Sequence, residues 1–439
     1  MRTIVIAFLI GSVQALSGLT LDAVLSRTLE KNPAIQQAKL QVEQAAGRRL
    51  VLRAIGLPDA RTLTPAGLQG GKRAGENSVQ PFAFARGQLT QPLFHAGVPA
   101  AFRRGDLEVL IAQQRLNLAV MEQLHTARVA FLTALYQDSL RAFAEEQRQR
   151  LQHNVTAQSE RYEQGQTQRG AVTVARVLEQ EVQPRIEESR RVANGALLQL
   201  AQTMGTQIGP SGELPTADGT LRWVSTTVDP EAQSKAALAR RADLQLARLL
   251  VRAAGEEQRM IEAAYFPAIQ ATVGGDYIPV SDLRRGSEGS PRRSDDIVSS
   301  ELRLGATYSW RVIDNGAVRG AALRQQAIRE INETVLARLE ANVPRELTRI
   351  ANTLRSLSAQ EEALEHGATV AAETVTAVQQ NLGQGLSSQL EYRTAESSLL
   401  QARAGSLKAA FDQQIALAEL DRVTGRYFQF SDNTTRNVP

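Results

Sequence analysis

The chain of 439 residues contains no cysteine, few aromatic residues and no block of like charges. Without cysteine, no disulfide bond can staple the fold, and no lipid can be attached through an N-terminal cysteine. Aromatic residues make up 5% of the sequence, which is little for a thick globular core. Ala, Gln, Leu, Glu and Arg dominate instead, as in long amphipathic helices. The net charge of +4 arises from interleaved acidic and basic residues, so we expect no nucleic acid partner.

Motifs for catalysis and for metal binding are also missing from the sequence. Neither a Gly-x-x-x-x-Gly-Lys loop nor a Gly-x-Ser-x-Gly turn occurs. The four histidines, His95, His125, His153 and His366, lack the spacing of metal ligands and are expected to be surface or packing residues. We therefore expect no enzymatic activity, no metal and no cofactor.

Residues 1–15 have the features of a secretory signal peptide. Arg2 gives a positive start, Thr3–Val13 form a short apolar stretch, and Ala15 supplies the small residue before cleavage near Leu16. The alternative is an N-terminal membrane anchor, but the apolar run is too short to span a bilayer. No later stretch of about 18 apolar residues occurs, so the exported protein is expected to be periplasmic, secreted or inserted as a β-barrel.

The two halves of the chain repeat one another. Segments of the first half return in the same order in the second: Asn32-Pro33-Ala34-Ile35 as Arg241-Ala242-Asp243-Leu244, Phe94-His95-Ala96-Gly97 as Ile313-Asp314-Asn315-Gly316, Gly165 as Gly385, and Gly205 as Gly425. Each half should therefore be one structural unit that packs against its copy. We expect a first repeat over 16–205, a linker over 206–229, a second repeat over 230–425 and a tail over 426–439.

Each half begins with a helix of moderate length. Apolar residues at helical spacing predict helices over 19–57 and 230–266, and Pro58 and Pro267 end them.

Each half then ends in a long helical hairpin. The outgoing helices are expected over 98–162 and 317–382, and about 65 residues at ~1.5 Å each span on the order of 100 Å. Pro344 lies inside the second of them and should bend it or force a local repair. Glycine-marked turns lead to returning helices over 170–204 and 387–424.

Between these helices the apolar pattern changes from helical to alternating. Ile269–Tyr277 and Val298–Arg311 predict two strands, which an exposed loop over Ser281–Asp296 would join. The first half has the same plan in weaker form, with a poor strand over Arg61–Gln69, a loop over Gly70–Gln80 and a strand over Phe82–Leu93.

Strands of about ten residues are long enough to cross a bilayer, and alternation then assigns their faces. Glu301, Arg303 and Arg311 should face a lumen, because charge on the lipid face costs ~2–4 kcal/mol at mid-bilayer. The lipid-facing residues would be Leu302, Leu304, Tyr308 and Trp310. Four strands cannot close a barrel alone, so we expect three copies to share a barrel of twelve strands. The alternative is a soluble protein whose strands pack on a core.

These features resemble the TolC-type outer-membrane efflux family over about residues 19–425. The resemblance is carried by Leu19-Thr20-Leu21-Asp22-Ala23-Val24, Asn32-Pro33-Ala34-Ile35, Gln91-Pro92-Leu93-Phe94-His95-Ala96-Gly97, Arg161-Tyr162-Glu163-Gln164-Gly165 and Asn381-Leu382-Gly383-Gln384-Gly385. It implies a mainly α-helical homotrimer with a small β-barrel in the lipid of a Gram-negative outer membrane and a helical tunnel in the periplasm. It also implies a periplasmic adaptor and an inner-membrane pump of RND or ABC type as partners.

The resemblance further implies two sites near the hairpin tips. The tips would dock the adaptor through Gly165, Gln166, Thr167, Gly385, Leu386 and Ser387; alternatively, the glycines only close the turns. Acidic residues after the second tip would constrict the pore. Glu391 occupies the first such position, whereas Thr394 replaces an acid at the second. The alternative is that Glu391 is one more solvated charge on a helix face.

We therefore expect an outer-membrane exit duct that conducts substrates passively for a pump. One alternative is the outer-membrane duct of a type I protein secretion system. The others are a periplasmic adaptor and a soluble coiled-coil scaffold. An adaptor would carry a single hairpin inside lipoyl and β-barrel segments, rather than a two-fold repeat with two strand pairs.

Overall fold

The computed structural model describes residues 18–73, 76–206, 214–277, 300–384 and 386–426. The chain forms two compact units, each built from separate stretches of sequence. Unit 1 comprises Met1–Leu40, Arg115–Gln245 and Arg338–Pro439, and unit 2 comprises Gln41–Gln114 and Leu246–Ala337. The expected loop over Ser281–Asp296 lies outside the described residues.

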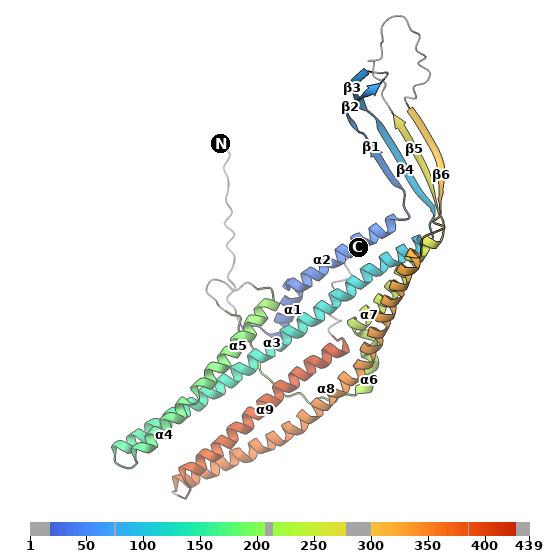
Figure 1. Ribbon diagram of the computed structural model, residues 1–439. Coiled ribbons are helices and arrows are strands. Elements are labelled where there is room, and N and C mark those ends of the chain that lie inside the picture. Colours follow the sequence, from blue (N-terminus) through green and yellow to red (C-terminus); the bar gives the residue numbers. More distant parts are fainter. Residues whose placement is uncertain (1–17, 74–75, 207–213, 278–299, 385, 427–439) are drawn as a thin grey trace, which may run out of the picture. The chain divides into compact units, whose positions relative to one another are not determined.

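The two halves of the chain have similar element orders (Figure 1). The first half contains α1 (Leu21–Lys31), α2 (Pro33–Ala54), β1 (Asp59–Leu63), β2 (Ala66–Arg73), β3 (Glu76–Ala83), β4 (Ala85–Phe94), α3 (Val98–Glu163), α4 (Arg169–Gln180) and α5 (Gln183–Thr203). The second contains α6 (Pro230–Arg240), α7 (Ala242–Glu262), the 3₁₀ turn η1 (Ala263–Tyr265), β5 (Ala268–Tyr277), β6 (Ser300–Ser309), α8 (Ala317–Gly383) and α9 (Gln389–Thr424).

The opening helix of each half is broken, which corrects the expectation of continuous helices over 19–57 and 230–266. Asn32 ends α1 with an extended backbone, as expected for the residue before a proline. Its buried side chain accepts a hydrogen bond from the Ile35 N–H (3.1 Å) and donates one to the Thr203 carbonyl (2.7 Å). Arg241 makes the corresponding break between α6 and α7.

Glycine ends the hairpin in each half and packs against that break. Gly205 and Gly425 have left-handed backbones, with φ of 62° and 70°. A Cβ atom on Gly205 would lie 2.3 Å from the Lys31 carbonyl oxygen, and one on Gly425 would lie 3.3 Å from the Arg240 carbonyl oxygen. Lys31 and Arg240 end α1 and α6, so the two halves repeat this contact as well as the sequence.

The strands form a four-stranded antiparallel sheet with the order β1-β4-β5-β6 (Figure 1). β2 and β3 form a separate antiparallel pair, in which Gly70 lies opposite Val79. The expected loop over Gly70–Gln80 is therefore largely strand, because cross-strand backbone bonding does not require the side chains that glycine lacks. The expected strand over Phe82–Leu93 is divided between β3 and β4.

The long outgoing helices are confirmed, whereas one returning helix is divided. α3 and α8 have 66 and 67 residues. The expected helix over 170–204 separates into α4 and α5 just before Pro184, a residue that is favoured in the first helical turn.

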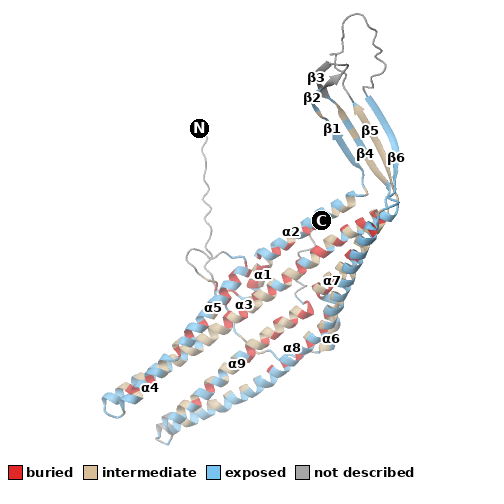
Figure 2. Cartoon of the chain, in the orientation of Figure 1, coloured by how far each residue is buried: buried red, intermediate tan, exposed pale blue. Residues whose placement is uncertain are grey.

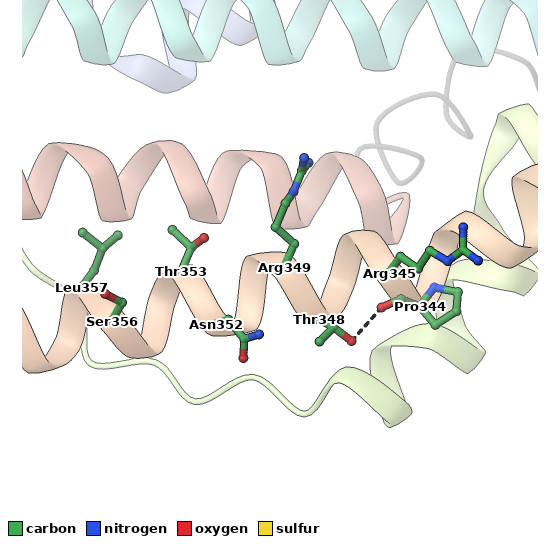
Figure 3. A pocket seen from close by; sticks show the side chains of 8 residues that line it. All are labelled: Pro344, Arg345, Thr348, Arg349, Asn352, Thr353, Ser356 and Leu357. Carbon is green, nitrogen blue, oxygen red and sulfur yellow. Dashed lines mark hydrogen bonds between the residues drawn. The ribbon is translucent and has the colours of Figure 1, made fainter.

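Pro344 lies within α8 and does not end it. Figure 3 shows this stretch, where a surface groove of about 850 Å³ is lined by α8 alone. The Thr348 hydroxyl donates to the Pro344 carbonyl oxygen at 2.8 Å.

Burial follows narrow stripes along the helices, while the sheet is largely uncovered (Figure 2). In unit 1 one hydrophobic cluster packs Ala127 and Phe131 of α3 against Leu200 of α5. In unit 2 Leu107 and Ile111 of α3 pack against Ala253 of α7. Among the described residues, no helix is both long and apolar enough to span a membrane.

Candidate functional site

The four-stranded sheet has one apolar and one polar face, as the alternation predicted. The register places Leu304 opposite Val273, and Val273 opposite Leu89. This apolar row crosses three strands, and Leu302 and Tyr308 lie on the same face because they are an even number of residues away on β6. Leu302 and Leu304 are each 80% exposed, so the apolar face has no cover within the described chain.

The polar face carries a network of ion pairs across three strands. Asp276 of β5 accepts a hydrogen bond from Arg86 of β4 at 2.6 Å and lies 3.5 Å from Arg303 of β6. Arg303 also pairs with Glu301 at 2.5 Å. The sequence analysis identified Glu301 and Arg303 but missed Arg86 and Asp276. Their signal was the same alternation, but their pairing depends on strand register, which the sequence does not reveal.

Two residues expected on β6 lie beyond its end. The strand stops at Ser309, so Trp310 and Arg311 are not strand residues, and alternation no longer assigns their faces. The indole N–H of Trp310 donates to the Tyr265 carbonyl at 3.1 Å instead. This contact ties the end of β6 to the turn that precedes β5.

The two hairpin tips share a backbone motif. Gly165 has φ of 72°, and the Gln166 N–H donates to the Arg161 carbonyl at 2.8 Å. The equivalent bond in the second tip joins Leu386 N–H to Asn381 O, also at 2.8 Å. A left-handed glycine with a bond of this span is the usual way to end a helix tightly.

The side chains at the tips are fully or partly open to solvent. Gln166 is exposed and Thr167 is half-buried in the first tip, while in the second Leu386 is 74% exposed and Ser387 is half-buried. Gly385 lies outside the described residues. An exposed leucine at a helical turn offers an apolar contact to a partner.

Glu391 has a structural role that the sequence analysis overlooked. It forms a capping box with Ser388, in which the Ser388 N–H donates to the Glu391 carboxylate (2.9 Å) and the Glu391 N–H donates to the Ser388 hydroxyl (3.2 Å). The Ser-x-x-Glu spacing is a readable sign of this motif. The carboxylate therefore stabilises the start of α9, whatever its role in a pore.

Glu391 and Thr394 lie together on one wall of a groove between α8 and α9. The groove has a volume of about 1050 Å³, and its opposite wall includes Glu362, His366 and Val370 of α8. The Thr394 hydroxyl donates to the Leu390 carbonyl at 2.9 Å, so it is bonded within its own helix. No positively charged residue occurs between Arg355 and Arg393, which leaves this end of the hairpin acidic.

The opposite faces of β6 predict unequal effects of two exchanges. Leu304→Arg should impair membrane assembly, because a charge on a lipid-facing position costs ~2–4 kcal/mol near mid-bilayer. Arg303→Leu is the matched control on the neighbouring residue and should have a much smaller effect. The measurement is the yield of folded oligomer in the membrane fraction; equal yields for the two variants would contradict the assignment of faces.

Two exchanges at the start of α9 separate capping from charge. Glu391→Gln should keep the capping box, because Gln can serve in it, but should lower the preference for cations over anions in single-channel recordings. Ser388→Ala should leave ion preference unchanged and destabilise the first turn of α9 by about 0.5–2 kcal/mol, measured by hydrogen exchange. If the ion preference of the Glu391→Gln variant were unchanged, Glu391 would serve only as a helix cap and would have no role in pore selectivity.

Comparison with known proteins agrees with this architecture. Residues 234–426 match the model of the outer membrane efflux protein family. No curated protein matches the chain at a significant level.

Several solved structures share the fold over nearly the whole chain. The outer membrane protein VceC from Vibrio cholerae is 15% identical, with a TM-score of 0.76 and coverage of 92% of this chain and 96% of VceC. The Campylobacter jejuni CmeC outer membrane channel is 12% identical, with a TM-score of 0.79 and coverage of 95% and 88%. The Neisseria gonorrhoeae MtrE outer membrane channel is 18% identical, with a TM-score of 0.74 and coverage of 92% and 88%.

The structural likeness shows the fold, and the family match in the second half adds the sequence pattern. The shared fold and the match over residues 234–426 make the chain similar to outer membrane efflux proteins and outer membrane channels.

Proposed function

We propose that three copies of this chain form the outer-membrane exit duct of a tripartite efflux system, through which substrates pass without energy input from the duct itself. The observation that carries this proposal is that both edge strands of the four-stranded sheet, β1 and β6, have one unpaired side among the described residues. Within the described residues, β1 pairs only with β4 and β6 pairs only with β5. Open strand edges in lipid leave backbone groups unpaired at a cost of several kcal/mol each.

The helices of unit 2 adjoin one another in the same order as the strands. Arg53 of α2 binds Asp106 of α3 at 2.9 Å, and Arg103 of α3 binds Glu256 of α7 at 3.0 Å. α7 in turn contacts α8, because the Gln325 side chain of α8 donates a hydrogen bond to the Ala254 carbonyl of α7 (3.4 Å). The helical order α2-α3-α7-α8 thus matches the strand order β1-β4-β5-β6.

The two outer helices of this array expose apolar side chains. Leu50 and Val51 of α2 are 64% and 70% exposed, and Leu323 and Ile331 of α8 are 57% and 62% exposed. Both the strand layer and the helix layer therefore end in unpartnered surface. A head-to-tail ring of copies would bring the edge formed by β1 and α2 against the edge formed by β6 and α8.

Three copies would supply twelve strands to one closed barrel. Two copies would already reach the smallest outer-membrane barrels, which have about eight strands, so the number three rests on the family resemblance. The polar face with Arg86, Asp276 and Arg303 would line the lumen, and the face with Leu302 and Leu304 would meet lipid.

A periplasmic adaptor and an inner-membrane pump of RND or ABC type complete the proposed assembly. The exposed tips support adaptor docking, because the left-handed Gly165 turn is compact and Leu386 is solvent-exposed. Compact turns allow a second pair of helices to approach closely.

Cysteine exchanges test the ring, because the chain has no cysteine of its own. Ala60→Cys on β1 should form disulfides between copies when it is combined with one of Leu302→Cys, Leu304→Cys or Ala306→Cys on β6. These positions share the apolar face, whereas Arg303→Cys and Gly305→Cys are the matched controls on the other face. The measurement is the number of chains, up to three, in the cross-linked species on denaturing gels. If all three cysteine pairs gave only monomers, this ring would be excluded.

Bulky exchanges at the tips test docking without altering the left-handed glycine. Gln166→Trp combined with Leu386→Trp should reduce adaptor co-purification and dye efflux by roughly tenfold, corresponding to about 1.4 kcal/mol, while trimers remain intact. Gln149→Trp, at an exposed position on α3, is the control. Wild-type efflux and adaptor recovery in the double variant would refute docking at the tips.

A further inference from the structure

Four contacts join α3 to α9 within unit 1, and together they form what we call the α3–α9 seam. Arg150 binds Glu396 at 3.0 Å, and the rings of Tyr136 and Phe411 stack with centroids 4.5 Å apart. Arg128 donates to Asp421 at 2.7 Å, and His125 Nε2 lies 3.5 Å from Glu419 Oε2. The seam ties the first helical hairpin to the second. His125 is its one member of a residue type whose ordinary pKa lies near neutral pH.

His125 sits in a crowded charged environment. Its side chain is only 18% exposed. Glu419 already accepts two hydrogen bonds from Arg422, at 2.8 and 2.5 Å, so its carboxylate is largely occupied. The other charged groups that act on the ring are Glu122 of α3 and Arg422 of α9, and Arg128 with Asp421 forms the neighbouring ion pair of the seam. Glu346 of α8 acts on Arg422, and Arg349 of α8 acts on Glu419.

The imidazole Nδ1 atom is buried and has no hydrogen-bond partner among the described residues. In a neutral ring this atom can remain an unprotonated lone pair. In a charged ring both nitrogens carry a proton, and the Nδ1 proton would have no acceptor. A buried donor without a partner is costly, so the closed seam disfavours the charged ring.

The pKa of His125 shifts in the direction that this geometry requires. Burial, aided by the nearby charge of Arg422, lowers the pKa below its ordinary value of 6.5. It outweighs the opposing effects of Glu419, Glu122 and the Ala418 backbone. With the folded pKa below the unfolded one, the open state binds protons more readily. The stabilisation of the closed seam is therefore complete above about pH 6.5 and is lost as the pH falls from there toward the folded pKa.

We infer that the α3–α9 seam is a proton-sensitive latch between the two helical hairpins, closed when His125 is neutral and loosened when the ring takes up a proton. Loosening separates α3 and α9 locally, so that water can reach the ring and accept a hydrogen bond from its Nδ1–H group. The latch is a property of the single chain; only its consequence, easier opening of the duct in acid, rests on the proposed function.

Hydrogen exchange on the purified full-length oligomer tests the latch. Protection of segments around His125 and Glu419, corrected for the intrinsic pH dependence of exchange, should fall about three- to tenfold between pH 7.5 and 5.5. His125→Gln should abolish this fall while keeping protection at pH 7.5. His95→Gln, a histidine of unit 2 and therefore outside the seam, is the control and should respond like the wild type.

A second exchange guards against misfolding of the first variant. Glu419→Gln removes the carboxylate that favours the charged ring, so the midpoint of the response should move to lower pH. A fall in protection that persists in His125→Gln, or a midpoint unmoved in Glu419→Gln, would overturn the latch. Loss of oligomer in every variant and in the wild type would instead count against the proposed ring.

Discussion

The structure depends on one constraint: backbone groups at the edge of a sheet need hydrogen-bond partners. The sheet β1-β4-β5-β6 ends in two strands with open edges, and its apolar face is uncovered. Lipid offers no hydrogen bonds, so a chain of this kind cannot stand alone in a membrane. Because α2, α3, α7 and α8 follow the order of the strands, a copy that paired with an edge strand would also meet the exposed apolar side chains of α2 or α8.

The two halves of the chain resemble one another more in geometry than in chemistry. Asn32 and Arg241 occupy the same break between helices, yet an amide bonded to the Thr203 carbonyl serves one half. In the other half, Arg241 stabilises the break through ion pairs with Asp243 and Glu346. The glycines at the hairpin ends fall against these breaks in both halves. At these breaks the two halves share the path of the backbone, and different side chains stabilise it in each half.

The two hairpins also differ in construction. The first is divided between α4 and α5, while the second returns in the single helix α9, which begins in a capping box. The second hairpin is acidic toward its tip, whereas basic and acidic residues alternate in the first. The α3–α9 seam connects these unlike partners, so its strength governs how independently they move.

Sequence alone determined the elements with long, regular periodicity: the outgoing helices, the returning α9, the alternation of β5 and β6, and the glycines that end the hairpins. These rest on local chemistry, since side-chain spacing and glycine's left-handed backbone act within a few residues. The tertiary structure decided the rest. The buried Asn32 amide finds its partner in the distant Thr203 carbonyl, Arg86 meets Asp276 only through strand register, and His125 lies against Glu419 only because α9 packs on α3. Contacts between residues far apart in the chain leave no periodic signal in the sequence.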